Sequence, residues 1–157
     1  MSSDDIWSKL VHAFKVNDKR FLSYIDEFKK NNPQWIERLR KELLGNNRVV
    51  ASAILAYLDE KEQMSIFDLL IHYASFTHGG TVFFRDLILG LPKEWVLKNI
   101  EKYTNSILDN GDEDEYRRIL ELFYKLDYNL AISLAERAQK NNNLTIREVG
   151  DDFIALL

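Results

Sequence analysis

A chain of 157 residues with 46% hydrophobic side chains is long enough for one domain with its own core, and its composition excludes disordered and fibrous proteins. Its formal net charge of -4 disfavours nucleic acid or anionic lipid as a partner unless a local basic face overcomes that balance. The lack of cysteine excludes disulfides, thiolate metal ligands and a cysteine nucleophile, and it fits a reducing compartment.

The N-terminal residues point to a cytoplasmic protein. The sequence MSSDDIWSKL opens with two acids where a secretory signal would carry cations. No segment approaches the roughly 18 consecutive apolar residues that span a membrane. We therefore expect a soluble chain without membrane contact. From its length we expect a single domain over residues 1–157, and this domain should be all-helical for the reasons that follow.

Apolar residues recur three and four positions apart from the first residues to the last. Two of the clearest runs are Ile6, Leu10, Phe14 and, later in the chain, Val50, Ile54, Leu58. This spacing is the period of an α-helix, whereas strands alternate with a period of two. The sequence predicts an all-α fold of about ten short helices.

Prolines, glycines and polar residues mark where these helices should begin and end. Asn32 with Pro33 and Leu91 with Pro92 are each predicted to open a helix, with the proline at its first position. Gly45 suits a left-handed residue after a helix. Capping boxes are predicted at three helix starts, formed by Ser65 with Asp68, Asp112 with Glu115, and Thr145 with Glu148.

Short connections should make successive helices antiparallel, which gives helical hairpins. The segments NNRVVASAILAYL (46–58) and NNLTIREVGDDFIALL (142–157) share a polar opening, a basic residue and a spaced aliphatic face. Each resembles the second helix of a HEAT-type hairpin, with Arg48 beside Val49, or Ile146 beside Arg147, near the helix start.

The resemblance implies a HEAT-like α-α superhelix, that is, an α-solenoid. Its hairpins would cover 35–58, 65–91 and 112–140, with the last helix left unpaired. The repeat lengths are uneven, and a compact irregular helical bundle is the alternative.

The stretch HYASFTHGGTVFF (72–84) contains the residues that most resemble a reactive site. His72 and His78 lie six apart, which turns them away from one another on a helix, so we expect no metal site and a partly buried His72. The amides of Gly79, Gly80 and Thr81 precede a helix and could hold an anion with help from Arg85. The lysine and spacing of a P-loop are absent, so a tight interhelical turn is the preferred interpretation.

Charge is distributed unevenly along the chain. Between residues 9 and 41, nine Lys and Arg stand against four Asp and Glu, and the C-terminal half is acidic. Nucleic-acid binding by the basic segment would need exposed aromatic rings, and the spacing of Trp7, Phe14, Tyr24 and Trp35 puts most of them on core faces. The acidic run DNGDEDE (109–115) lacks the twelfth-position glutamate of a calcium loop, and it is interpreted as an exposed loop that ends in a helix cap.

These observations favour a protein-interaction or scaffolding module without a cofactor over an enzyme. Stacked hairpins leave an extended surface that suits another protein as partner. One alternative is a regulatory protein, such as a toxin-neutralising immunity protein that masks a basic enzyme. Another is a small enzyme or anion-binding protein with its site near His72 to Arg85. The residues predicted for the partner surface are Arg38, Lys41, Arg48, Asp112, Glu113 and Asp114.

Overall fold

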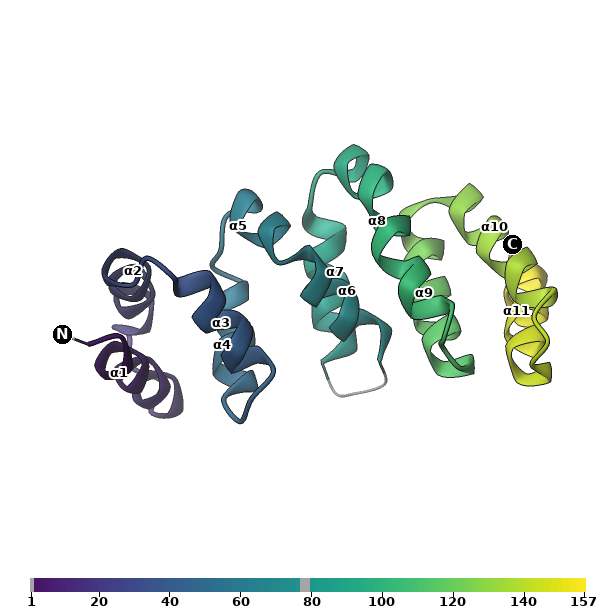
Figure 1. Ribbon diagram of the computed structural model, residues 1–157. Coiled ribbons are helices and arrows are strands. Elements are labelled where there is room, and N and C mark those ends of the chain that lie inside the picture. The colour runs from purple at the N-terminus through teal and green to yellow at the C-terminus, as the bar shows by residue number, and fades with distance from the viewer. Residues whose placement is uncertain (1, 77–79) are drawn as a thin grey trace. The chain divides into compact units, whose positions relative to one another are not determined.

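The computed structural model describes residues 2–76 and 80–157, and in this part of the chain it contains eleven α-helices and no β-strand (Figure 1). The prediction of an all-α fold is therefore confirmed. None of the helices in these residues is both long and apolar enough to cross a membrane. The contacts divide the chain into two compact units, residues 1–66 and 67–157. The expectation of one domain over 1–157 stays a prediction.

The first unit is built from five helices around one apolar core. α1 packs against α2 and α4, and α3 packs against α4. The periodic residues of the sequence supply that core, since Leu10, Ile25, Leu39 and Ile54 are all buried. The helices are α1 (Ser3–Lys15), α2 (Phe21–Asn31), α3 (Trp35–Leu43), α4 (Arg48–Leu55) and α5 (Glu60–Ser65).

Helix α5 was not predicted, because it contains no buried residue and therefore no apolar stripe. A capping box starts it instead: the Asp59 carboxylate accepts from the Glu62 amide, and the Glu62 carboxylate accepts from the Asp59 amide. Side chains from two other helices hold it in place. Lys29 pairs with Glu62, and Arg40 donates to the Ser65 carbonyl at 2.8 Å.

In the second unit each helix packs against the next one along the chain. α6 packs against α7, α8 against α9, and α10 against α11 (Figure 1). α9 lies at the centre, since it also contacts α6, α7, α10 and α11. The helices are α6 (Phe67–Ser75), α7 (Thr81–Gly90), α8 (Lys93–Leu108), α9 (Glu113–Leu126), α10 (Tyr128–Gln139) and α11 (Leu144–Leu156).

This pairing corrects one expectation for the C-terminal part. The last helix, α11, is not unpaired, because it packs closely along α10 and also against α9. Gly150 permits the close approach: a Cβ atom there would lie 2.7 Å from the Ala135 carbonyl oxygen and 2.7 Å from the Gln139 amide nitrogen. The backbones of α10 and α11 therefore meet at this glycine.

Two of the three predicted capping boxes were wrong. The Asp112 and Glu115 box is confirmed at the start of α9. Ser65 instead ends α5, and its hydroxyl donates to the Glu62 carbonyl, so it cannot cap α6. The cap of α11 is Asn143, two residues before Thr145, because the Asn143 side chain accepts from the Thr145 amide and the helix begins at Leu144.

The predicted helix boundaries at proline and glycine were displaced. α3 begins at Trp35, two residues after Pro33, and Pro92 is the residue before α8 instead of its first residue. Gly45 is not left-handed; in the described residues Asn17 is the residue with positive φ, at 52°. Asn tolerates this conformation better than most other residues because its short polar side chain bonds locally.

Candidate functional site

The described residues of the stretch 72–84 lie at the C-terminal end of α6 and in the first turns of α7. His72 is exposed, so the expectation of a partly buried histidine was wrong, and its ring lies 4.5 Å from the ring of Phe76, centroid to centroid. His78 and Gly79 lie outside the described residues. In residues 2–76 and 80–157, no group of three or more His, Asp or Glu side chains is placed to hold a metal ion.

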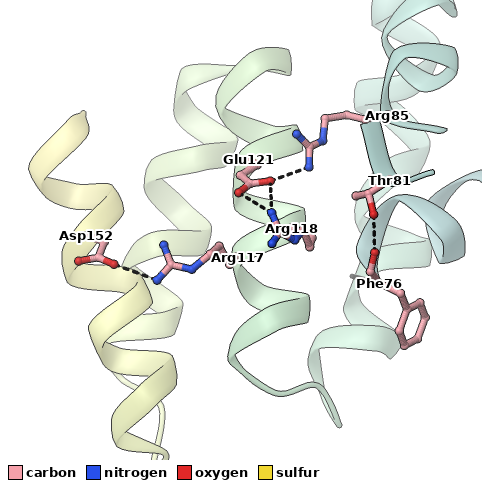
Figure 2. A network of polar contacts seen from close by, with 7 residues as sticks. All are labelled: Phe76, Thr81, Arg85, Arg117, Arg118, Glu121 and Asp152. Carbon is pink, nitrogen blue, oxygen red and sulfur yellow. Dashed lines mark hydrogen bonds and ion pairs between the residues drawn. The ribbon is translucent and has the colours of Figure 1, made fainter. Parts of the chain in front are cut away.

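The residues of the predicted anion site have structural partners. Gly80 is the residue before α7, and the Thr81 hydroxyl donates to the Phe76 carbonyl at 2.6 Å, which closes the turn between α6 and α7 (Figure 2). Arg85 points away from this turn toward α9, where its Nη2 donates to Glu121 Oε2 at 2.6 Å. The geometry favours a structural role for Thr81 and Arg85, and an anion site there stays a prediction.

Glu121 is the centre of a polar network that joins α7 to α9. Its carboxylate also accepts two bonds from Arg118 Nη1, at 2.9 and 3.0 Å (Figure 2). Arg85 is buried, and its Nε atom has no hydrogen-bond partner in the described structure. A buried guanidinium that depends on one carboxylate fixes the position of α7 on α9, because separating the two would leave a buried charge unpaired.

A second set of contacts joins α9 to α11. Arg117 Nη2 donates to Asp152 at 2.9 Å (Figure 2), and the Thr145 hydroxyl donates to Glu113 at 3.1 Å. The two contacts occur in the same order along both helices, so α9 and α11 run in the same direction side by side. We call the surface formed by Glu113, Asp114, Arg117, Glu148 and Asp152 the α9–α11 surface.

The α9–α11 surface is predominantly acidic. It combines four carboxylates with the one guanidinium of Arg117. Asp114 and Glu148 are exposed, and neither carboxylate makes an ion pair or hydrogen bond with the part of the chain that the structure describes. Residues 67–157 as a whole carry fifteen Asp and Glu against ten Lys and Arg. Their potential therefore attracts a cationic partner.

The three predicted acidic residues have different roles on this surface. Asp112 caps α9, where its carboxylate accepts from the amides of Asp114 and Glu115. Glu113 is bonded to Thr145, whereas Asp114 is exposed. The sequence interpretation missed Glu148 and Asp152; the signal was the spacing of 145, 148 and 152, which puts these residues on one face of a helix.

The three predicted cations belong to the first unit. Arg38 is half-buried and has partners within the first unit. Its Nη1 donates to Asp4 at 2.6 Å and its Nε to Glu42 at 2.8 Å, and the guanidinium lies 5.8 Å from the Trp7 ring. Lys41 and Arg48 are exposed.

A hollow beside α8 and α10 in the second unit is open and polar, with a volume of about 730 Å³. Arg137, one of the charged residues that line it, is paired with Asp109, which also lines it. Arg137 donates to Asp109 and to Asn105, both at 2.8 Å.

No family model, curated protein or solved structure matches this chain. The argument about function therefore depends on the geometry and charge of the surfaces described above.

Proposed function

We propose that this chain is a protein-binding module and that its α9–α11 surface binds a basic protein. The observation that carries the proposal is the row of carboxylates on two parallel helices, with Asp114 and Glu148 exposed at its edge. Exposed charges of one sign raise the association rate with an oppositely charged partner and select against partners of the same sign.

The contacts between the helices that form this surface support the role. The Arg117–Asp152 pair and the Glu113–Thr145 bond hold the two helices in a fixed relation, and the Arg85–Glu121 pair does the same for α7. A surface that is already ordered loses little conformational entropy when a partner binds. The free energy of its contacts with the partner then contributes to affinity.

We further propose that the helices form HEAT-like hairpins. The α10–α11 hairpin supports this: Ile146 is buried, and Arg147 Nη1 donates to the Asn141 and Asn142 carbonyls at 2.8 and 3.0 Å. Arg147 thus binds the loop that joins the two helices. Consecutive packing of paired helices around α9 also fits such an array, in which each hairpin contacts its neighbours.

An inhibitor of a basic enzyme is the second candidate, as for a toxin-neutralising immunity protein. The same unpaired carboxylates favour it, because an acidic surface can cover the cationic active site of an enzyme that acts on nucleic acid. A binding role in place of catalysis is supported by the structural engagement of Thr81 and Arg85, which carried the enzymatic alternative.

The test is a pair of charge-matched double variants of the full chain. Asp114→Lys with Glu148→Lys reverses the unpaired acids of the α9–α11 surface. Glu94→Lys with Glu101→Lys makes the same change in net charge on α8, where both residues are exposed. Proteins of the source organism that bind the wild-type chain are identified by mass spectrometry, and their affinities are measured by calorimetry.

We expect a basic partner whose affinity falls on the order of tenfold to a hundredfold in the first variant, since each exposed charge contributes up to about 1 kcal/mol and reversal adds repulsion. The α8 variant should bind as the wild type does. Equal affinity for both variants, or an acidic partner, would refute the proposal. An assay of the partner's activity then separates the inhibitor from a scaffold.

A further inference from the structure

The end of α1 contains a turn that brings aromatic residues from two helices together. Asn17 is left-handed, its amide donates to the Phe14 carbonyl at 3.2 Å, and the Asp18 amide donates to the Ala13 carbonyl at 2.8 Å. These two bonds define a Schellman motif. It reverses the chain so that Phe21, the first residue of α2, lies 5.7 Å from Phe14, ring to ring.

An apolar hollow of about 310 Å³ lies beside this turn, between α1, α2 and the C-terminal end of α4. Three alanines and three aromatic residues supply most of its lining. Tyr57 lies 6.3 Å from Phe21 between ring centroids, and its side chain is 55% exposed. The volume is at the lower end of the range for ligand pockets, which suits one anchoring side chain. The hollow is lined by Ala13, Phe14, Asn17, Asp18, Phe21, Ala53, Ala56 and Tyr57.

A second hollow, of about 280 Å³, lies on the other side of Asp18 and is basic. The Tyr24 ring lies between two cations, with Lys9 Nζ at 6.0 Å and Arg20 Cζ at 5.7 Å from its centroid. His12 also lines this hollow. Lys9 and Arg20 carry two positive charges against the one carboxylate of Asp18, so the hollow favours an anionic group.

Asp18 orients one of these cations, Arg20. Its carboxylate accepts from Arg20 Nη2 at 2.8 Å and from Arg20 Nε at 3.1 and 3.2 Å. The Arg20 hydrogen bonds lower the pKa of Asp18 to about 2, so the carboxylate stays ionised at neutral pH. The Arg20 side chain is 70% exposed, which leaves its outer edge accessible for a carboxylate of a partner.

We propose that the two hollows on either side of Asp18 together receive a short segment of a partner protein that carries an aliphatic or aromatic side chain next to a carboxylate. The apolar side chain enters the hollow of Phe14, Phe21 and Tyr57, and the carboxylate pairs with Arg20 beside Lys9. The positive charge of the basic hollow selects an acidic residue of the partner, and the volume of the apolar hollow admits one apolar side chain as the anchor.

A protein segment fits these features better than nucleic acid does. Stacking of bases needs open aromatic faces, whereas Phe14 and Phe21 are half-buried and their rings lie against each other. The net charge of -4 also repels a polyanion. The inference concerns residues 1–66 and does not depend on the α9–α11 surface, so either proposal can fail alone.

The test begins with selection of random dodecapeptides, displayed on phage, on the immobilised full chain. The selected peptides are synthesised with a fluorescent label, and their affinities are measured by fluorescence anisotropy. Ala53→Trp fills the apolar hollow, Tyr57→Ala opens it without overpacking, and Arg20→Ala removes the cation. Lys30→Ala, an exposed cation at the other end of α2, is the matched control. Circular dichroism establishes which variants are folded.

We expect enriched peptides with an apolar residue beside Asp or Glu, and an affinity about tenfold lower for Tyr57→Ala, for Arg20→Ala and for folded Ala53→Trp. Lys30→Ala should bind normally. Changing the peptide carboxylate to its amide should abolish the effect of Arg20→Ala.

Three results would overturn the proposal. In the first, the selection enriches no peptide on the wild-type chain relative to an immobilised Tyr57→Ala chain. In the second, the enriched peptides bind Arg20→Ala and Tyr57→Ala as tightly as they bind the wild type. The third is a labelled single-stranded oligonucleotide that binds the chain in an Arg20-dependent way while no peptide does, which would assign the basic hollow to nucleic acid.

Discussion

Gly150→Ala is expected to destabilise the protein, although alanine is the better helix former. The added Cβ atom would lie 2.7 Å from two backbone atoms of α10, the Ala135 oxygen and the Gln139 nitrogen, and 2.9 Å from Gln139 Cγ. Ordinary contact begins at 3.4 Å. The two helices must therefore separate by about 0.7 Å, since backbone atoms cannot move aside as a flexible side chain does.

The magnitude follows from two opposing terms. Overpacking of this kind costs about 1–3 kcal/mol. The gain in helix propensity from Gly to Ala offsets at most about 1 kcal/mol. We expect a net loss of about 1–2 kcal/mol in the free energy of unfolding. Gly90, the last residue of α7, is the matched control because a Cβ there meets nothing within 4 Å.

The assay is urea unfolding of the full chain, followed by far-ultraviolet circular dichroism. Gly150→Ala should lower the midpoint without a change of slope, and Gly90→Ala should leave it unchanged or raise it slightly. If Gly150→Ala were as stable as the wild type, the close approach of α10 and α11 would be refuted.

The remaining predictions concern a buried ion pair, a carboxylate and a left-handed residue. Glu121→Ala should cost about 3 kcal/mol because it leaves the Arg85 guanidinium buried and unpaired, whereas Arg85→Met should cost less than about 1 kcal/mol; equal losses in urea unfolding would contradict this. The pKa of Asp18 is lowered from 3.8 to about 2 in the folded state, so the ionised carboxylate stabilises the fold. The stabilisation that Asp18→Asn removes should therefore be constant above about pH 4 and vanish as the pH falls toward 2. A stability difference between wild type and Asp18→Asn that is independent of pH would contradict this. Asn17→Val should cost about 1–2 kcal/mol at its φ of 52° while Asn17→Gly costs nothing, and similar midpoints for the two would show that the residue is not left-handed.

The period of apolar residues was enough to predict the helices that bury a face. Leu10, Ile54 and Ile119 each lie on such a stripe and are buried. α5 could not be found in this way, because it has no buried residue and depends on the Asp59–Glu62 capping box and on contacts from α2 and α3. Whether such a helix forms depends on local polar signals and on tertiary contacts.

Capping signals alone were a weaker guide to helix boundaries than periodicity was. Thr145 fits the pattern of a cap, but Asn143, two residues earlier, takes that role because its side-chain oxygen accepts from the Thr145 amide. Several residues in a polar run can each cap a helix, and the register of the buried face determines which one does.

The candidate site was predicted on one helix and missed on the other. The acidic cap around Asp112 and Asp114 is a local feature, and the sequence shows it directly. Glu148 and Asp152 join it because α11 lies alongside α9, where Arg117 pairs with Asp152. A contact between residues thirty-five positions apart depends on packing, which periodicity does not specify.

The most direct test of the α9–α11 surface is site-specific photo-crosslinking in living cells of the source organism. A benzoyl-phenylalanine replaces Glu148 on α11 in one protein and Glu94 on α8 in another, both at exposed positions of residues 67–157. We predict that the probe at 148 captures one basic protein and that the probe at 94 does not. Capture of the same proteins at both positions, or of an acidic protein at 148, would contradict the proposed role of this surface.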